Sequence, residues 1–267
     1  MVNLKSNYFQ KLVALNKSRK IFKNWNICTK LYLNQVRDKF AILETRTNKK
    51  IKIRTSTTDF MALANVWLLE DYKIKKFEIN SDDVIIDIGA HIGIFTIYAS
   101  QFCNNGKIYS FEPVRENYDL LLNNIKLNNS EQVKPFNLAV SNTNDDVVAI
   151  YINDDKAAHS IFPSSESSIN VKSITLQNIF EENNINHCNF LKLDCEGAEY
   201  EILCNLPTKY FKEIDKIVME CHFVDKKPEL ISELKQILVK QGFQVRTKTI
   251  SNELVLLYAI KDGIILC

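Results

Sequence analysis

The chain has 267 residues, of which 46% are hydrophobic and 25% charged, and its formal net charge is +2. This length suffices for one substantial hydrophobic core with an extension, and the composition is that of a globular protein rather than a disordered or fibrous one. No apolar run reaches the roughly 18 residues of a membrane-spanning helix, and we expect no signal peptide because the first residues lack a compact apolar stretch.

The charge is divided unevenly along the chain. Residues 1–54 carry 14 Lys and Arg against 2 Asp and Glu, whereas residues 55–267 carry 20 against 30. Such asymmetry indicates a basic surface for an anionic partner, either a membrane surface or nucleic acid. An equally supported alternative is that these lysines form the solvated side of helices that pack on the rest of the protein. Aromatic residues that alternate with the charges suit either a bilayer interface or packing on the catalytic domain, so peripheral membrane contact through residues 1–54 is one of two predictions.

The cysteines favour a reducing environment. Seven of them are spread along the chain without a C-x-x-C pair: Cys28, Cys103, Cys188, Cys195, Cys204, Cys221 and Cys267. An odd number with this spacing is typical neither of a disulfide framework nor of a structural zinc site. We therefore predict a cytoplasmic protein.

The N-terminal part is predicted to be an extension, residues 1–70, before a catalytic domain at residues 71–267. Its pattern indicates helices within residues 5–35, a hairpin with strands at 40–44 and 50–54, and a helix that begins at Thr58–Asp59 and ends at Leu69.

From residue 84 onward, predicted strands and helices alternate. The strands are expected at 84–88, 107–112, 133–138, 189–194, 215–221, 243–248 and 253–260, and the helices at 93–102, 114–128, 175–183, 198–205 and 228–240. This alternation predicts an α/β fold with parallel strands and helical crossovers. The short polar stretch between the last two strands makes the final strand antiparallel. A polar insertion at 145–172 interrupts the alternation, and its His159 and Ser160 could contact a polar substrate.

The most informative motif begins with Val84–Ile88, a β-branched run that predicts a buried strand. The strand carries Asp87 near its end, continues into a Gly89-x-x-x-Gly93 turn, and is followed by a predicted helix. A strand, a glycine turn and a helix N-terminus form a nucleotide-type cofactor site in open α/β sheets. The carboxylate suits the ammonium and sulfonium groups of S-adenosylmethionine and would repel a pyrophosphate, so we predict S-adenosylmethionine rather than NAD.

A second predicted strand ends in Glu112-Pro113. Glu112 follows Gly89 by 23 residues, and an acid about 20 residues beyond the glycine turn is placed to reach ribose hydroxyls. The two motifs, with a helix between them, support each other.

A third motif, Leu191–Glu199, ends the fourth predicted strand. It gathers Lys192, Asp194, Glu196 and Glu199 at the edge of the sheet where ligands bind. Carboxylates this close cost free energy unless they hold a cation, pair with the lysine or bind a polar ligand. Acids in the first turn of a helix are the ordinary alternative, and the position in the predicted cleft favours a functional role.

Together with Glu220-Cys221-His222, these motifs make residues 80–223 resemble the FkbM-type methyltransferases. The resemblance implies a class I methyltransferase, Rossmann-like fold with a seven-stranded, mostly parallel sheet. It also implies S-adenosylmethionine-dependent O-methylation, often of sugars, polysaccharides or natural products, and so a small-molecule or glycan acceptor. The residues implied to line the cofactor are Asp87, Gly89, Ala90, His91, Gly93, Glu112, Pro113, Ala139 and Asp194. The family often has Asn at the position of His91, whose alternative role is that of a polar turn residue.

A hydroxyl acceptor must lose a proton, and a positioned base contributes about 10²- to 10⁴-fold to such a rate. His222, at the end of the fifth predicted strand, is the first candidate base, and Asp194 is the second. Lys192, Glu196 and Glu199 complete the predicted catalytic set. A divalent cation such as Mg²⁺, held by Asp194, Glu220 and His222, would instead lower the pKa of the acceptor, although the spacing does not require it.

Two other functions compete with this prediction. The basic N-terminus could serve an RNA or DNA methyltransferase, but the fourth strand does not end in the Asn/Asp-Pro-Pro-aromatic string of exocyclic-amine methylases, so a nucleic-acid partner is disfavoured. A non-catalytic cofactor-binding module that docks a partner is the second alternative, and the complete set of acids argues against it. The sequence leaves the oligomeric state open.

Overall fold

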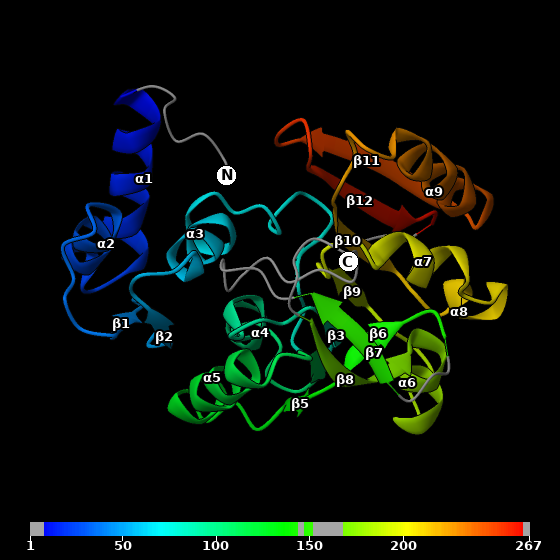
Figure 1. The fold of residues 1–267 in the computed structure, drawn as a ribbon, viewed down its shortest axis with the longest axis horizontal. Helices are drawn as coiled ribbons and strands as arrows, with labels where there is room; N and C mark the ends of the chain where they lie inside the picture. Colours follow the sequence, from blue (N-terminus) through cyan, green and yellow to red (C-terminus); the bar gives the residue numbers. More distant parts are fainter. Residues whose placement is uncertain (1–7, 144–146, 152–167, 264–267) are drawn as a thin grey trace.

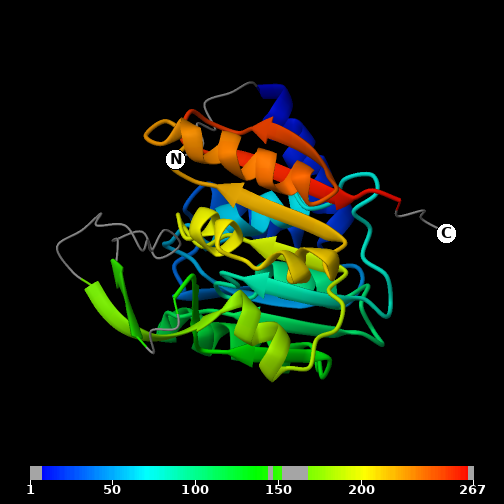
Figure 2. The same cartoon turned by 90° about the vertical axis from the view of Figure 1, so that its right-hand side faces the viewer.

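The computed structural model describes residues 8–143, 147–151 and 168–263, with side chains from residue 14 onward. Its central sheet consists of β3 (Val84–Ile88), β4 (Lys107–Phe111), β5 (Val133–Phe136), β9 (Phe190–Leu193), β10 (Lys216–Cys221), β11 (Phe243–Thr249) and β12 (Val255–Lys261). The strand order is β11-β12-β10-β9-β3-β4-β5 (Figures 1 and 2). The strands from β5 to β10 run parallel, and β12 is antiparallel to both of its neighbours. The predicted α/β fold, with its seven strands and reversed final strand, is confirmed.

Helices cover both faces of this sheet. They are α4 (Ile94–Ser100), α5 (Arg115–Leu127), α6 (Leu176–Glu182), α7 (Glu199–Cys204), α8 (Thr208–Lys212) and α9 (Pro228–Lys240). The five helices predicted from residue 84 onward are present, α9 with the predicted bounds and the other four slightly shorter. Helix α8 was not predicted, because a single turn that follows Pro207 is too short to show helical periodicity.

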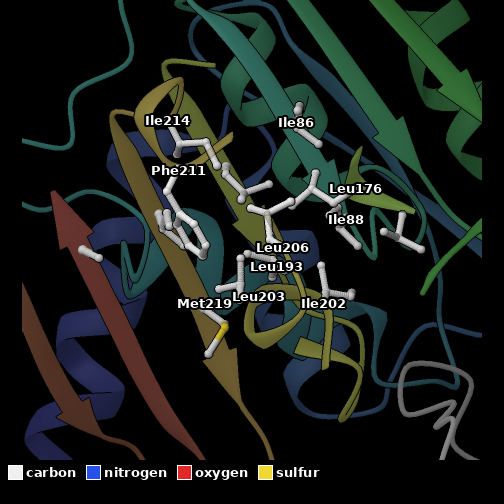
Figure 3. Close-up of a cluster of buried hydrophobic side chains, with 14 of the residues drawn as sticks. Ile86, Ile88, Leu176, Leu193, Ile202, Leu203, Leu206, Phe211, Ile214 and Met219 are labelled. Carbon is white, nitrogen blue, oxygen red and sulfur yellow. The ribbon is translucent and has the colours of Figure 1, made fainter. Parts of the chain in front are cut away.

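The two faces of the sheet hold two cores, and alternation along β3 separates them. Ile86 and Ile88 belong to the core that α6, α7, α8 and α9 cover, whereas Ile85 belongs to the core on the other face. Figure 3 shows Ile86 and Ile88 in the first core with Leu193 of β9 and Met219 of β10. Because both faces of the central strands are buried, their ends are the edges at which polar groups can meet a ligand.

The N-terminal segment has the predicted elements: α1 (Tyr8–Ile21), α2 (Trp25–Tyr32), a hairpin of β1 (Phe40–Glu44) and β2 (Lys50–Arg54), α3 (Asp59–Leu63), and a π-helical turn, η1 (Ala64–Leu68). Thr58 is the N-cap residue of α3, in agreement with the predicted start of this helix. The Thr58 side chain does not accept a capping hydrogen bond from the described first turn, and the Asp59 carboxylate binds Arg54 instead.

This segment packs on the sheet face that α4 and α5 also cover (Figure 1). Aromatic side chains connect it to the sheet layer: the ring centroids of Phe22 and Trp67 are 6.1 Å apart, those of Trp67 and Tyr98 5.3 Å, and those of Tyr72 and Phe95 5.0 Å. The apolar side of the basic segment therefore completes one layer of the molecule. The boundary at residue 70 and membrane contact stay predictions.

The predicted insertion contributes strands to a second, three-stranded sheet. This sheet has the order β6-β8-β7, with β6 (Ala139–Ser141), β7 (Val147–Tyr151) and β8 (Ser168–Thr175). His159 and Ser160 lie outside the described residues. Within the described part of the chain, no helix is long and apolar enough to cross a membrane, and the six cysteines that it contains are free thiols.

Candidate functional site

The turn between β3 and α4 is tightly packed against the loop that follows β9. Gly89 and Gly93 have φ angles of +73° and +85°, which glycine adopts at little cost. A Cβ atom on Gly89 would lie 1.7 Å from the backbone oxygen of Asp194. The first glycine is therefore required for the approach of the two loops, which brings the first and third sequence motifs together.

A cleft opens at the carboxyl ends of β3, β4 and β9. Its walls come from the three motifs and from the second sheet: Ile88, Gly89, Phe111, Glu112, Pro113, Val114, Asn117, Leu138, Ala139, Val140, Ile150, Asp194, Cys195, Glu196 and Ala198. Of the predicted cofactor residues, Gly89, Glu112, Pro113, Ala139 and Asp194 line this cleft. The other four predicted cofactor residues do not line the cleft and lie behind the residues that do: Asp87, Ala90, His91 and Gly93.

Glu112 is the acid on the β4 side of the cleft. Its Oε1 accepts hydrogen bonds from the Val114 backbone N–H at 2.9 Å and the Asn117 side chain at 3.3 Å, and its Oε2 accepts one from the His91 backbone N–H at 2.8 Å. Burial raises the pKa of Glu112 to about 7 although these donors lower it. Three of roughly four acceptor positions are thus filled, which leaves capacity for a ligand hydroxyl.

Asp87 and Lys192 form the layer beneath the β3 turn. Asp87 is fully buried, and its Oδ2 accepts a hydrogen bond from Thr96 at 2.7 Å. The Lys192 ammonium lies 3.2 Å from Asp87 Oδ1 and 3.5 Å from Asp194 Oδ2, and it donates to the Gly89 carbonyl at 2.8 Å. Burial alone would lower the pKa of Lys192, but Asp87 and Asp194 raise it above its ordinary value, so the lysine is a fixed cation.

His222 stands at the centre of a ring of carboxylates on the β9 and β10 side. Its Nδ1 lies 3.0 Å from Glu199 Oε1, and its Nε2 lies 3.6 Å from Glu196, 3.9 Å from Asp194 and 4.0 Å from Glu220. The fully buried Glu199 also accepts backbone N–H groups of Cys195 and Gly197, both at 2.8 Å. Glu199 thereby fixes both the loop after β9 and the direction in which His222 Nε2 points.

The charges in this ring shift each other's pKa values. Burial lowers the pKa of His222, but Glu196, Glu199 and Asp194 outweigh burial and raise it well above its ordinary value. Burial raises the pKa of Glu196 to about 8, and burial together with Asp194 raises that of Glu220 to about 7. The ring therefore holds protons near neutral pH, as a site of proton transfer does.

Two predicted catalytic residues thus have an indirect position. Lys192 and Glu199 lie behind the described cleft wall and hold the loops that form it, whereas Asp194 and Glu196 line the cleft and His222 adjoins Asp194. Ligand atoms of the predicted metal residues Asp194, Glu220 and His222 all lie within 4.8 Å of one another. Their donor set of two carboxylates and an imidazole fits a divalent cation.

Two residues of the N-terminal half that support the site were not predicted from the sequence. The Tyr72 hydroxyl donates to Glu220 at 2.6 Å across 148 residues of sequence. Arg54 contacts both His91 and Asn117, which hold Glu112. Neither residue lies in a recognisable motif, so the fold alone reveals these contacts.

The acids of the cleft suit the chemistry of S-adenosylmethionine. Carboxylates lie on its β9 side at Asp194 and Glu196, where a positively charged group would be favoured, and Glu112 lies on its β4 side. Beneath the turn, one cation faces two carboxylates: the Lys192 ammonium lies 3.2 Å from Asp87 Oδ1 and 3.5 Å from Asp194 Oδ2. The negative charge beneath the turn is thus incompletely compensated, which favours a cationic ligand.

Comparisons with known proteins show which family the chain belongs to. A family model described as a methyltransferase FkbM domain matches residues 87–245. The chain is 28% identical over 165 residues to the hexuronic acid methyltransferase AglP of Haloferax volcanii, which covers 59% of this chain and 65% of that protein. It is 24% identical over 186 residues to Methyltransferase 1 of Beauveria bassiana, which covers 61% and 73%. Among solved structures, Methanococcus jannaschii TYW2 in complex with AdoMet has a TM-score of 0.49 and 19% sequence identity. The match covers 84% of this chain and 86% of that protein.

Proposed function

The chain belongs to the FkbM methyltransferase family, and we propose that it transfers a methyl group from S-adenosylmethionine to a hydroxyl oxygen of a sugar or glycan. One observation carries this proposal: Asp194 lines the cleft and lies 3.9 Å from His222 Nε2. A hydroxyl bound at the cleft edge would find there both a hydrogen-bond acceptor and a base.

The cofactor would lie across the cleft. When bound, S-adenosylmethionine supplies a methyl group on a positively charged sulfur that needs no further activation. Glu112 would accept hydrogen bonds from the ribose, and Asp194 and Glu196 would lie toward the positively charged groups. Lys192 holds Asp194 and the Gly89 carbonyl in place, so the wall of the cleft is organised before the ligand binds.

The residues at the edge of the cleft would remove the proton of the acceptor. Asp194 would orient the hydroxyl, and His222 Nε2, held by Glu199 through Nδ1, would receive its proton. Because the surrounding carboxylates raise the pKa of His222 well above its ordinary value, His222 must lose a proton before it can act as a base. The methylation rate should therefore rise with pH.

The charge of the site favours a neutral hydroxyl over a carboxylate as acceptor. Five carboxyl groups, those of Asp87, Asp194, Glu196, Glu199 and Glu220, face two basic side chains, Lys192 and His222. An anionic acceptor would meet repulsion here. A carboxylate acceptor would also need no base. We therefore propose ether formation on a sugar, and not ester formation on a uronic acid.

Calorimetric titration with S-adenosylmethionine, followed by methyl-transfer assays on matched neutral and uronic-acid glycosides, tests this proposal. We expect cofactor binding that Glu112→Ala weakens, and methyl ethers on neutral sugar hydroxyls. Methyl esters as the sole product would contradict the acceptor class. Salt-sensitive binding and methylation of RNA would support the nucleic-acid alternative. Absence of cofactor binding would contradict a methyltransferase and favour the alternative of a non-catalytic module that docks a partner.

Metal assistance of the same reaction is a second candidate. Asp194, Glu220 and His222 would hold the ion, which would lower the pKa of the acceptor hydroxyl. Activity measured after EDTA treatment and after Mg²⁺ addition decides between the two mechanisms. Activity that EDTA leaves unchanged assigns activation of the hydroxyl to His222 or Asp194 alone. Full dependence on Mg²⁺ assigns the lowering of the hydroxyl pKa to the ion, with the proton passing to a cleft carboxylate or to solvent.

A further inference from the structure

A buried ion pair connects the N-terminal hairpin to the turn between β3 and α4. Arg54, the last residue of β2, is only 7% exposed. Its Nε lies 2.9 Å from Asp59 Oδ2 and its Nη2 lies 2.8 Å from Asp59 Oδ1. Asp59, fully buried at the start of α3, also accepts the Arg54 backbone N–H at 2.8 Å. This two-point pairing fixes the plane of the guanidinium group.

The same Nη2 atom reaches two residues of the catalytic half. It donates to Asn117 Oδ1 at 2.9 Å and lies 3.0 Å from His91 Nε2. Because Nη2 carries two hydrogens and also contacts Asp59 Oδ1, one of these hydrogens is shared between two acceptors. His91 can accept this bond only as a neutral imidazole with its proton on Nδ1, and burial, which lowers its pKa to about 4, keeps it neutral. Arg54 thus holds a side chain of the β3 turn and a side chain of α5.

Both of these residues position Glu112. The Asn117 NH₂ group donates to Glu112 Oε1, and the His91 backbone N–H donates to Oε2. Because Arg54 occupies Asn117 Oδ1, the amide cannot rotate without placing its NH₂ group against the guanidinium. Two of the three donors that orient the Glu112 carboxylate therefore belong to residues whose side chains contact Arg54, and the third comes from neighbouring Val114.

We propose that Arg54 is a positioning residue for the cofactor ribose and acts through Asn117 and His91 on Glu112. The inference rests on the proposed function, because it needs a ribose-bearing cofactor at Glu112. It assigns a role in cofactor recognition to a residue outside the segment 87–245 that the family model matches. The N-terminal hairpin is then part of the cofactor site, and not only a cover for one face of the sheet.

The test measures recognition of the ribose rather than overall affinity. Calorimetry gives the Kd values of S-adenosylhomocysteine and of its 2′-deoxy and 3′-deoxy analogues. The wild-type protein should bind at least one deoxy analogue about tenfold more weakly, as expected for the loss of a hydrogen bond to a charged group. The double substitution Arg54→Met with Asp59→Asn removes both buried charges together. In this double variant, the Kd of the deoxy analogue divided by the Kd of S-adenosylhomocysteine should fall close to one. The Kd of the deoxy analogue itself should stay within about twofold of its wild-type value.

Two further variants separate positioning from folding. Arg54→Lys keeps the charge beside Asp59 but lacks the planar fork, so the ratio should fall in a protein that is fully folded. Lys248→Met with Asp71→Asn removes an ion pair of 2.8 Å between β11 and the segment before β3, and neither residue lines the described cleft or contacts Glu112 in the hydrogen bonds given above. This control should leave the ratio unchanged.

The outcomes are distinguishable. A wild-type protein that binds neither S-adenosylmethionine nor S-adenosylhomocysteine overturns the proposed function and this inference with it. Wild-type binding without discrimination among the three ligands overturns the assignment of Glu112 to the ribose, and so the role of Arg54. Equal weakening of all three ligands in the Arg54 variants, with the ratio preserved, makes Arg54 a purely structural residue and overturns the inference alone.

Discussion

Two buried polar clusters contact the turn between β3 and α4, and they differ in charge balance. Around His222, carboxyl groups outnumber bases, and two carboxyl pKa values are raised to about 7 and about 8. Around Arg54, one guanidinium meets one carboxylate, and the other partners are a neutral imidazole and an amide. Unbalanced buried charge costs folding free energy unless a ligand offsets it. The first cluster is therefore suited to chemistry on a cationic ligand, and the second to holding geometry.

The largest effect should come from removing the base of the first cluster. His222→Gln should lower turnover by about 10²- to 10⁴-fold, because the hydroxyl would keep its proton, and it should change the Kd of S-adenosylhomocysteine little. Methyl transfer to the acceptor identified by the glycoside assay, together with calorimetry, measures both quantities. If His222→Gln retains turnover and Asp194→Asn loses it, Asp194 is the base.

The second cluster should respond to loss of charge by losing stability. Arg54→Met alone leaves Asp59 buried without its cation, and we expect the free energy of unfolding to fall by about 3–5 kcal/mol. Adding Asp59→Asn should restore most of this loss, because it removes the uncompensated charge. Urea denaturation measures both variants. A double variant as unstable as the single one would show that packing, not charge, determines the effect.

The response of stability to pH should separate the clusters further. Glu196, Glu220 and His222 all have raised pKa values, so the folded state holds protons that the unfolded chain releases. Carboxyl protonation then favours folding, and stability should fall as pH rises from about 4.5 to 8, by at most about 1.4 kcal/mol per pH unit for each group. Glu196→Gln should reduce this slope, as urea denaturation at several pH values would show. An unchanged slope in this variant would contradict the assignment to Glu196.

Ligand affinity should change with pH in the opposite direction. As Glu112, Glu196 and Glu220 ionise between about pH 6 and 8, S-adenosylmethionine should bind about tenfold more tightly. S-adenosylhomocysteine, which lacks the sulfonium charge, should gain less. Calorimetry of both ligands at pH 6 and 8 gives this difference. An equal gain in affinity for both ligands would show that these carboxylates do not interact with the positive charge of the sulfur.

The sequence predicted the first cluster well because its members lie in short motifs at strand ends. Once β9 and β10 were expected to be parallel neighbours, Asp194 and His222 had to meet at one edge. Their separate roles could not be predicted, since burial distinguishes them: Lys192 and Glu199 carry the same kinds of charge as the cleft residues but lie behind the wall.

The second cluster could not be predicted from sequence. Arg54 was one basic residue in a basic run, and its partners His91 and Asn117 follow it by 37 and 63 positions. His91 was expected either at the cofactor or as a polar turn residue. It lies in the turn after β3 with a φ of +52°, and its side chain contacts Arg54. Such contacts depend on how the hairpin packs on the sheet, which no local pattern encodes.

The smallest effect concerns the outer surface of the N-terminal segment. We propose that it contacts an anionic bilayer, because a groove of about 220 Å³ between α1, α2, α3 and η1 is lined by apolar side chains such as Leu15, Met61 and Leu69. Arg19, Lys20 and Lys30 are exposed on the same helices.

Sedimentation with vesicles of phosphatidylglycerol should show weak binding that 0.5 M salt abolishes, and phosphatidylcholine vesicles should bind less. Leu69→Asp should reduce binding, whereas Val239→Asp on the exposed side of α9 should not. Equal binding by both variants would place the contact elsewhere and leave the N-terminal lysines as a solvated face.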